Sequence, residues 1–293
     1  MKAHPIRTVV ATGVLLSASM ISMSQALAQG PWAFSANIGA VSNYMWRGVT
    51  QTGDQAAIQG GVDVAHESGF YAGTWVSNID WDEGSSEDVS GTVAVDPTTI
   101  SGFAEDADGN LLVTGATSGA DAASPNYELD VYLGFGGNIT DDLSYDLNTI
   151  YYAYPDGRDS DFWEVGGSAT FKWFTLGLAY TISGENDGGL FDDGDIYYFG
   201  GAEFALPYDF GFSVRGGYYD FRHDEVVVGS VTDAAGTSFD VTETADYWNY
   251  GASISREAGD FGTFSLNWDQ NNGKQDVGYN TDPKFWVGWN KEF

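Results

Sequence analysis

The sequence predicts an all-β fold: a closed, antiparallel, transmembrane up-and-down β-barrel of about 12 strands, with short periplasmic turns and long acidic extracellular loops. Segments of about ten residues with alternating apolar and polar side chains recur along the chain, and this length lets a tilted strand cross a bilayer. The connections between these segments are long and short in turn. The last segment, 283–293, alternates strictly and ends on Phe293, as outer-membrane barrel proteins usually do.

Residues 1–28 have the organisation of an export signal. Lys2 and Arg7 precede an apolar stretch, and a small-x-small cleavage pattern follows at 26–28. The stretch contains serines and is too short to cross a bilayer, which argues against a retained membrane anchor. We therefore expect a cleaved signal peptide, localisation in the bacterial outer membrane, and one barrel domain over residues 29–293.

The composition excludes several classes of function. Without Lys2 and Arg7, nine of the 11 Lys and Arg residues remain against 42 Asp and Glu, so the clustered cations that bind nucleic acid are missing. The chain has no cysteine and hence no disulfide or thiolate metal site, and we expect no cofactor. The 39 glycines and 45 aromatic residues favour many half-apolar strands over a helical or α/β protein.

Period-two alternation defines the predicted strands. The clearest are 32–40, 58–64, 127–135, 145–149, 163–171, 174–182, 198–204, 210–215, 248–254, 264–269 and 284–290. A further segment, 70–81, is ambiguous in phase, although Tyr71, Trp75, Ile79 and Trp81 form its more apolar face. Twelve strands is the preferred count, with ten or fourteen as alternatives because strand boundaries drift by a few residues.

The connections supply independent support. The longer set is 47–54, 82–125, 155–161, 183–195, 223–246 and 271–283, and the shorter set is 67–69, 138–142, 172–174, 206–209 and 257–261. Short periplasmic turns opposite longer outer loops are typical of outer-membrane barrels. A secreted β-sandwich or a lipocalin-like barrel would also alternate, but it does not explain the long-short pattern.

Charged residues on the polar faces are the candidates for a pore lining. The strand phase points seven carboxylates and two cations inward: Asp63, Glu128, Asp130, Asp146, Glu164, Glu203 and Asp269, with Arg215 and Lys172. Inward charges require water or a paired network. An open, wet lumen of this composition would prefer cations, whereas pairing of Arg215 and Lys172 with several carboxylates would plug the barrel. A twelve-stranded circumference favours the open lumen.

The acidic loops contain candidate calcium ligands. Asp106, Asp108 and Asn110 match the first positions of a calcium loop, but Thr117 occupies the position of the bidentate Glu. Residues 192–195 form a second candidate. Solvated turns rich in Asp and Asn are the simpler interpretation of both.

Histidine gives little support for an enzyme. His66 is predicted at the short-turn end of one strand and His223 at the long-loop end of another, so the two cannot share a site across the apolar band. A Ser-His type of hydrolase would depend on one isolated histidine. We therefore expect no catalytic residues.

Residues 42–51, S-N-Y-M-W-R-G-V-T-Q, resemble the S-x-Y-x-x-R-G-x-[ST]-Q block of the TorF family of porin-like proteobacterial outer-membrane proteins. Weaker agreement follows at 57–61, 66–73, 75–78, 151–155, 206–208 and 291–293. Ala56 departs from the Pro that is frequent in the family, and 82–125 resembles an insertion. The resemblance implies an outer-membrane barrel with a porin role, and it implies no particular substrate.

Arg47 lies in this block, where the first strand meets its outer loop, with Tyr44 and Trp46 expected at the depth of the aromatic girdle. Arg47 would either reach lumen carboxylates or contact lipopolysaccharide phosphate from the rim. Gly48 allows a turn or bulge conformation that other residues disfavour.

Two functions follow as expectations. The first is a channel for passive diffusion of small solutes or ions, mildly selective for cations. The second is a non-conducting barrel whose acidic outer loops bind divalent cations or a surface partner. Expected partners are outer-membrane lipid and lipopolysaccharide, and the barrel-assembly machinery, with Phe293 as its assembly signal.

Overall fold

A computed structural model describes residues 30–81, 113–114, 125–157, 159–186, 189–232 and 237–293. The predicted signal peptide and the calcium candidates Asp106, Asp108 and Asn110 lie outside the described residues, as does most of 82–125. No helix in the described ranges is long and apolar enough to span a membrane.

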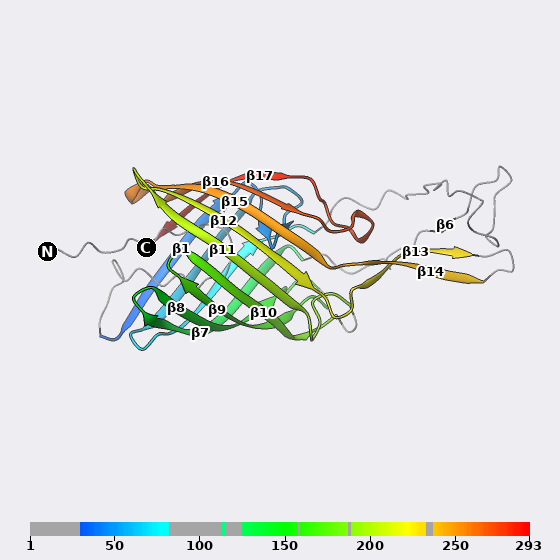
Figure 1. Cartoon of the computed structure of the whole chain (residues 1–293), viewed down its shortest axis with the longest axis horizontal. Helices are drawn as coiled ribbons and strands as arrows, with labels where there is room; N and C mark the ends of the chain where they lie inside the picture. Colours follow the sequence, from blue (N-terminus) through cyan, green and yellow to red (C-terminus); the bar gives the residue numbers. More distant parts are fainter. Residues whose placement is uncertain (1–29, 82–112, 115–124, 158, 187–188, 233–236) are drawn as a thin grey trace.

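Twelve antiparallel strands close into a barrel (Figure 1). They are β1 (Trp32–Val41), β4 (Ala57–His66), β5 (Phe70–Asn78), β7 (Tyr127–Thr140), β8 (Leu143–Ala153), β9 (Phe162–Phe171), β10 (Phe174–Gly184), β11 (Ile196–Leu206), β12 (Phe210–Asp220), β15 (Tyr247–Glu257), β16 (Thr263–Asn271) and β17 (Lys284–Glu292). Each pairs with the next of the twelve, and β17 pairs with β1. The predicted fold class and strand count are confirmed.

The outer wall of the barrel is apolar. Ile58, Val62 and Leu147 are 63%, 57% and 59% exposed, while Asp146, beside Leu147 in β8, is buried. The same alternation recurs in β17, where Phe285 is exposed and Trp286 is buried. A soluble barrel would point its apolar faces inward, so this arrangement excludes the sandwich and lipocalin alternatives and requires lipid around the wall.

The structure resolves the phase of segment 70–81, which the sequence left ambiguous. In β5 the more apolar set faces the lumen: Tyr71 donates a hydrogen bond to Asp146, and the Trp75 ring packs against Tyr44. Val76 lies on the outer face instead. The reason is that the lumen here contains packed aromatic residues, so an apolar inward face is satisfied by protein and needs no lipid.

The connections differ in length at the two ends of the barrel. At one end the strands are joined by short turns, one of which contains the 3₁₀ turn η1 (Gly259–Phe261). At the other end β13 (Glu225–Thr232) and β14 (Ser238–Thr244) form a hairpin that projects beyond the barrel, and β6 (Val113–Thr114) pairs with β13 (Figure 1). Much of 223–246, predicted as a loop, is therefore a β-hairpin. Its acidic residues concealed the alternation around its valines.

The barrel closes between β1 and β17. Asn37 pairs with Glu292, and the pairing extends to the last residue. The Phe293 N–H donates to the Ala36 carbonyl oxygen at 2.8 Å, and the Ala36 N–H donates to the Phe293 carbonyl oxygen at 3.3 Å. The Phe293 ring is 64% exposed, so its backbone, and not its side chain, joins the ladder.

Deleting Phe293 removes two backbone hydrogen bonds from the closing seam. We expect a smaller fraction of the purified chain to refold into the compact barrel, because unpaired backbone groups are costly in an apolar environment. The measurement is the gel-mobility difference between heated and unheated samples. Phe293→Ala keeps both backbone bonds and should refold like the wild type. Equal refolding of the deletion and the Ala variant would contradict this role of the terminal pair.

Candidate functional site

The candidate site is built around residues 42–56, which we call the constriction segment. It contains β2 (Met45–Trp46) and β3 (Val49–Thr50), and Tyr44, Met45 and Trp46 are all buried. Tyr44 and Trp46 were expected at girdle depth, and that expectation is wrong. Both side chains lie inside the barrel, where the segment folds back into the lumen.

A two-residue turn lets the segment reverse inside the barrel. Met45 pairs with Thr50 and Trp46 with Val49, so the turn is formed by Arg47 and Gly48. Both have positive φ, 48° and 79°, as tight hairpin turns require. A Cβ on Gly48 would lie 2.5 Å from the Asn249 Cβ, so space as well as conformation favours glycine there.

Hydrogen bonds within the segment fix its shape. The Asn43 Nδ2 donates to Asp54 at 2.7 Å, and the Thr50 hydroxyl donates to the Asn43 Oδ1 at 2.7 Å. The Thr52 hydroxyl donates to the Gln55 carbonyl oxygen at 2.6 Å and accepts the Tyr44 N–H at 3.2 Å. These polar groups find their hydrogen-bond partners within the segment. The other side chains of the segment make contacts with the barrel wall.

Trp46 is the centre of an aromatic cluster that fills the lumen near its long-loop end. Its ring centroid lies 6.0 Å from Tyr152, 6.1 Å from Phe162, 5.7 Å from Phe191 and 6.1 Å from Tyr219. These are edge and tilted contacts, the geometry that aromatic pairs prefer. The cluster joins the constriction segment to β8, β9, β12 and the loop before β11.

Arg47 forms an ion pair with the barrel wall. Among the described residues, it is the only buried ion pair between the constriction segment and the wall. The Arg47 guanidinium donates to both carboxylate oxygens of Glu164 on β9, at 2.8 and 2.6 Å. The two side chains are 7% and 1% exposed. The guanidinium also lies 4.2 Å from the ring centroids of Trp46 and Tyr197. Arg47 therefore points into the lumen and not toward lipopolysaccharide at the rim.

The segment is attached around the rest of the wall by further bonds. The Tyr44 hydroxyl donates to Glu128 on β7, the Asn271 side chain on β16 donates to the Gly48 carbonyl oxygen, and Lys284 on β17 pairs with Asp54. Contacts thus reach β5, β7, β8, β9, β11, β12, β16 and β17. The constriction segment spans the lumen from wall to wall.

The seven predicted inward carboxylates all lie on the lumen face. Glu128, Asp130, Asp146, Glu164 and Asp269 are buried, Asp63 is half-buried, and Glu203 is exposed opposite the buried Ser213 near the short-turn end. Lys172 does not join them: it lies in the turn after β9 and pairs with Asp142 of a neighbouring turn at 3.6 Å. Its predicted inward phase is wrong because the strand ends at Phe171.

Besides Glu164, which pairs with Arg47, most of these carboxylates accept hydrogen bonds from tyrosines, Arg215 or Trp286. Tyr44 and Tyr154 donate to the two oxygens of Glu128 at 2.9 and 3.0 Å. Tyr71 donates to Asp146, and Tyr132 donates to Asp63. Arg215 donates to both oxygens of Asp269 at 2.7 and 2.6 Å, with the Trp286 indole at 2.8 Å.

Sequence reasoning did not single out these tyrosines or Trp286 as partners of the carboxylates. The phase of Tyr132 offered a signal, since it continues the inward series Glu128–Asp130–Tyr132 of β7. An aromatic ring on a polar face indicates a donor for an inward acid.

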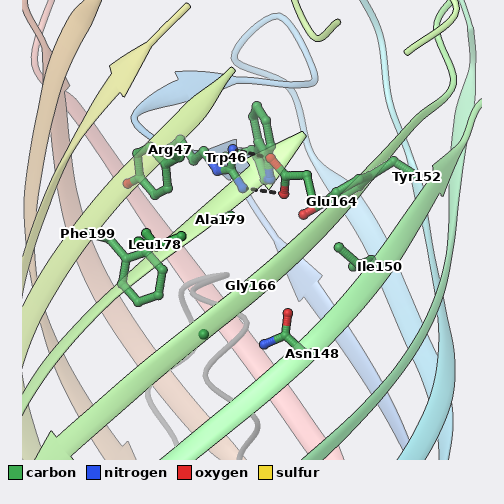
Figure 2. Close-up of a pocket in the computed structure, with 12 residues that line it drawn as sticks. Trp46, Arg47, Asn148, Ile150, Tyr152, Glu164, Gly166, Leu178, Ala179 and Phe199 are labelled. Atoms are coloured by element: carbon green, nitrogen blue, oxygen red, sulfur yellow. Dashed lines mark hydrogen bonds and ion pairs between the residues drawn. The ribbon is translucent and has the colours of Figure 1, made fainter. Parts of the chain in front are cut away.

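A small cavity lies beside the Arg47–Glu164 pair, and Figure 2 shows its lining. Its polar groups include Arg47, Glu164, Asn148 and Tyr152, and its volume is about 40 Å³. That volume suits a few water molecules or a small ion and is too small for an organic solute.

Residues 192–195 form hydrogen bonds and an ion pair that stabilise the loops at this end of the barrel. Asp195 accepts the Arg222 N–H at 2.8 Å, and Asp193 pairs with the Arg222 guanidinium at 2.6 Å. Burial raises the pKa of the Asp195 carboxyl above its ordinary value. In the ranges that the structure describes, no group of three His, Asp or Glu side chains is arranged to hold a metal ion. His66 and His223 lie at opposite ends of the barrel, at the end of β4 and beyond the end of β12.

A family model described as a bacterial protein of unknown function (Gcw_chp) matches residues 25–277. The chain belongs to this family. The likeness of residues 42–51 to the TorF block remains a resemblance, and the block itself corresponds to most of the constriction segment. No curated protein matches the sequence.

Among solved structures, the barrel resembles outer-membrane porins. The KdgM porin is 8% identical, with 88% of this chain and 99% of that chain covered and a TM-score of 0.46. The NanC porin is 9% identical over 87% and 98%, with a TM-score of 0.47. OprD from Pseudomonas aeruginosa is 12% identical over 89% and 65%, with a TM-score of 0.38. One KdgM structure holds disordered oligogalacturonate. At these similarities, only the side chains of this chain can carry an argument about its function.

Replacing Arg47 by Met should destabilise the barrel by about 3–5 kcal/mol in free energy of unfolding, because Glu164 would remain buried without its cation. Glu164→Gln combined with Arg47→Met should recover a large part of the loss. The measurement is a denaturant unfolding curve in detergent for the wild type, both single variants and the double variant. Additive losses across this cycle would contradict a direct buried pair.

Proposed function

We propose that the protein is a narrow outer-membrane channel that passes small cations and limits larger solutes at the constriction segment. The observation that carries the proposal is the inverted polarity of the barrel. Its outer wall is apolar, and its inner face carries seven carboxylates. Lipid outside and water inside satisfy that arrangement.

The charge of the lumen supports preference for cations. Arg47 and Arg215 each pair with one carboxylate, which leaves five of the seven inward carboxylates without a cationic partner among the described residues. Fixed charges in a low-dielectric wall act strongly on a passing ion. A polyanion such as the oligogalacturonate bound to the KdgM porin would be repelled by such a lumen, so that ligand is not transferred to this chain.

The second candidate is a barrel that stays closed. The contacts of the constriction segment with strands around most of the circumference favour it, because these contacts leave a space of only about 40 Å³ beside Arg47. The two candidates differ in one measurable property. A narrow channel gives small conductance steps in a planar bilayer, and a closed barrel gives none at any voltage.

The expected partners are proposed on the same grounds. The apolar wall would contact lipid, and the hairpin of β13 and β14 would extend on the outer side, beside lipopolysaccharide. The Phe293 ring is exposed at the closing seam, and this exposure supports its proposed role as an assembly signal.

Trp46→Ala should raise single-channel conductance several-fold, because it removes the ring at the centre of the aromatic cluster. The measurement is stepwise conductance of purified protein in a planar bilayer, with the zero-current potential in a salt gradient as a second readout. Trp248→Ala on the outer wall is the matched control, since that ring is 57% exposed, and it should leave conductance unchanged. Anion preference, or equal conductance of the wild type and Trp46→Ala, would contradict the proposal.

The orientation predicts where a protease reaches the protein on intact cells. Cleavage should occur within 223–246, which projects from the long-loop end, and the short turns should remain intact. The measurement is mass spectrometry of the fragments after brief digestion. Cleavage confined to 258–262 would reverse the orientation, and recovery of the protein in the soluble periplasmic fraction would exclude the outer membrane.

A further inference from the structure

The charges around the constriction segment do not balance. Glu128, Asp130 and Glu164 are 2%, 3% and 1% exposed, and Arg47 is the nearby cation bonded to one of them. Glu128 lies on the same face of β7 as Asp130, and Glu164 lies on β9, two strands away in the barrel. Three buried carboxylates and one guanidinium leave a surplus of negative charge, which is costly unless something compensates it.

The hydrogen bonds indicate where the compensation is missing. Both oxygens of Glu164 accept from Arg47, and both oxygens of Glu128 accept from tyrosine hydroxyls. Arg47 can only donate, so both of its bonds go to the ionised form of Glu164. Asp130 differs, because its buried Oδ1 has no hydrogen-bond partner.

The surroundings of Asp130 are suited to a cation. Trp75 on β5 and Tyr152 on β8 are its direct cross-strand partners, so aromatic side chains flank it on both sides of the inward face. Aromatic faces attract cations and do not compete with them as donors. Glu128 is two residues away on the same face of β7, about 7 Å along the strand.

We propose that Asp130, with Glu128 beside it and Trp75 and Tyr152 around it, forms a transit site for a monovalent cation such as K⁺ inside the constriction. The inference rests on the proposed channel function and names the ion class that the channel takes. The site is not a divalent chelate, because no three acidic or histidine side chains in the described ranges are arranged to hold a metal ion. Weak binding of a partly hydrated ion is what conduction requires, since the ion must also leave.

Binding can be tested without conduction. Full-length wild type in detergent is melted in 0.1 M KCl and in 0.1 M N-methylglucamine chloride, whose organic cation is much bulkier than K⁺. A ligand that binds only the folded state raises the melting temperature. We expect the wild type to melt about 2–4 °C higher in KCl. Asp130→Asn, which keeps the shape and removes the charge, should lose most of this difference.

Glu203→Gln is the matched control. It removes one inward carboxylate at an exposed position near the short-turn end, and it should keep the K⁺ effect. Equal melting of the wild type in both salts would overturn the proposal even if Asp130→Asn fails to fold. A K⁺ effect that survives in Asp130→Asn would also overturn it. Equal melting of the wild type in both salts is the result expected if a proton, and not a cation, neutralises Asp130.

Planar-bilayer recordings separate this site from the channel. Conductance of the wild type should saturate as KCl is raised, and that of Asp130→Asn should rise more nearly in proportion. Conductance steps without any K⁺-dependent melting would support the channel and exclude the cation site. Absence of conductance together with K⁺-dependent melting would exclude the channel and support the cation site.

Discussion

The buried pair between Arg47 and Glu164 holds residues 42–56 across the barrel, and the arrangement of the lumen depends on it. A segment that turns inward must leave the outer rim, bury its backbone and bring a positive charge into a low-dielectric space. Each of these steps is unfavourable alone. The bidentate contact with Glu164, the aromatic rings around the guanidinium and the internal bonds of Asn43 and Thr52 offset them together.

Because this pair holds the constriction segment near one end of the barrel, the burial of the lumen carboxylates differs between the two ends. Near the long-loop end, aromatic rings pack around Trp46, and Glu128, Asp130 and Glu164 are buried. Toward the short turns, Asp63 is half-buried and Glu203 is exposed, as in a wet vestibule. An ion that crosses the barrel would therefore lose much of its hydration only near Asp130 and Glu164. Selectivity is expected to arise there, where the field of a fixed charge is least screened.

Much of the barrel could be predicted because lipid imposes a simple rule on every strand. Phe285 and Trp286 are both large and aromatic, yet the period of two placed one outside and one inside. The rule fails where protein replaces lipid or water. Tyr44 and Trp46 have the composition of a girdle whether they meet lipid or a folded-in segment, and Trp75 faces inward because Tyr44 covers it. Lys172 was misplaced because phase has no meaning beyond the end of a strand. The pairing of Arg47 with Glu164, 117 residues apart, depends on barrel register that local pattern does not contain.

In the channel that we propose, the conducting path runs past the constriction segment. The chain has no cysteine, so a single cysteine at Val49 provides a unique reactive position within that segment. Addition of a cationic methanethiosulfonate reagent during bilayer recording should reduce the current through Val49→Cys and leave the wild type unaffected. Current through Val49→Cys that is unchanged after complete modification, verified by mass spectrometry, would show that ions do not pass the constriction segment.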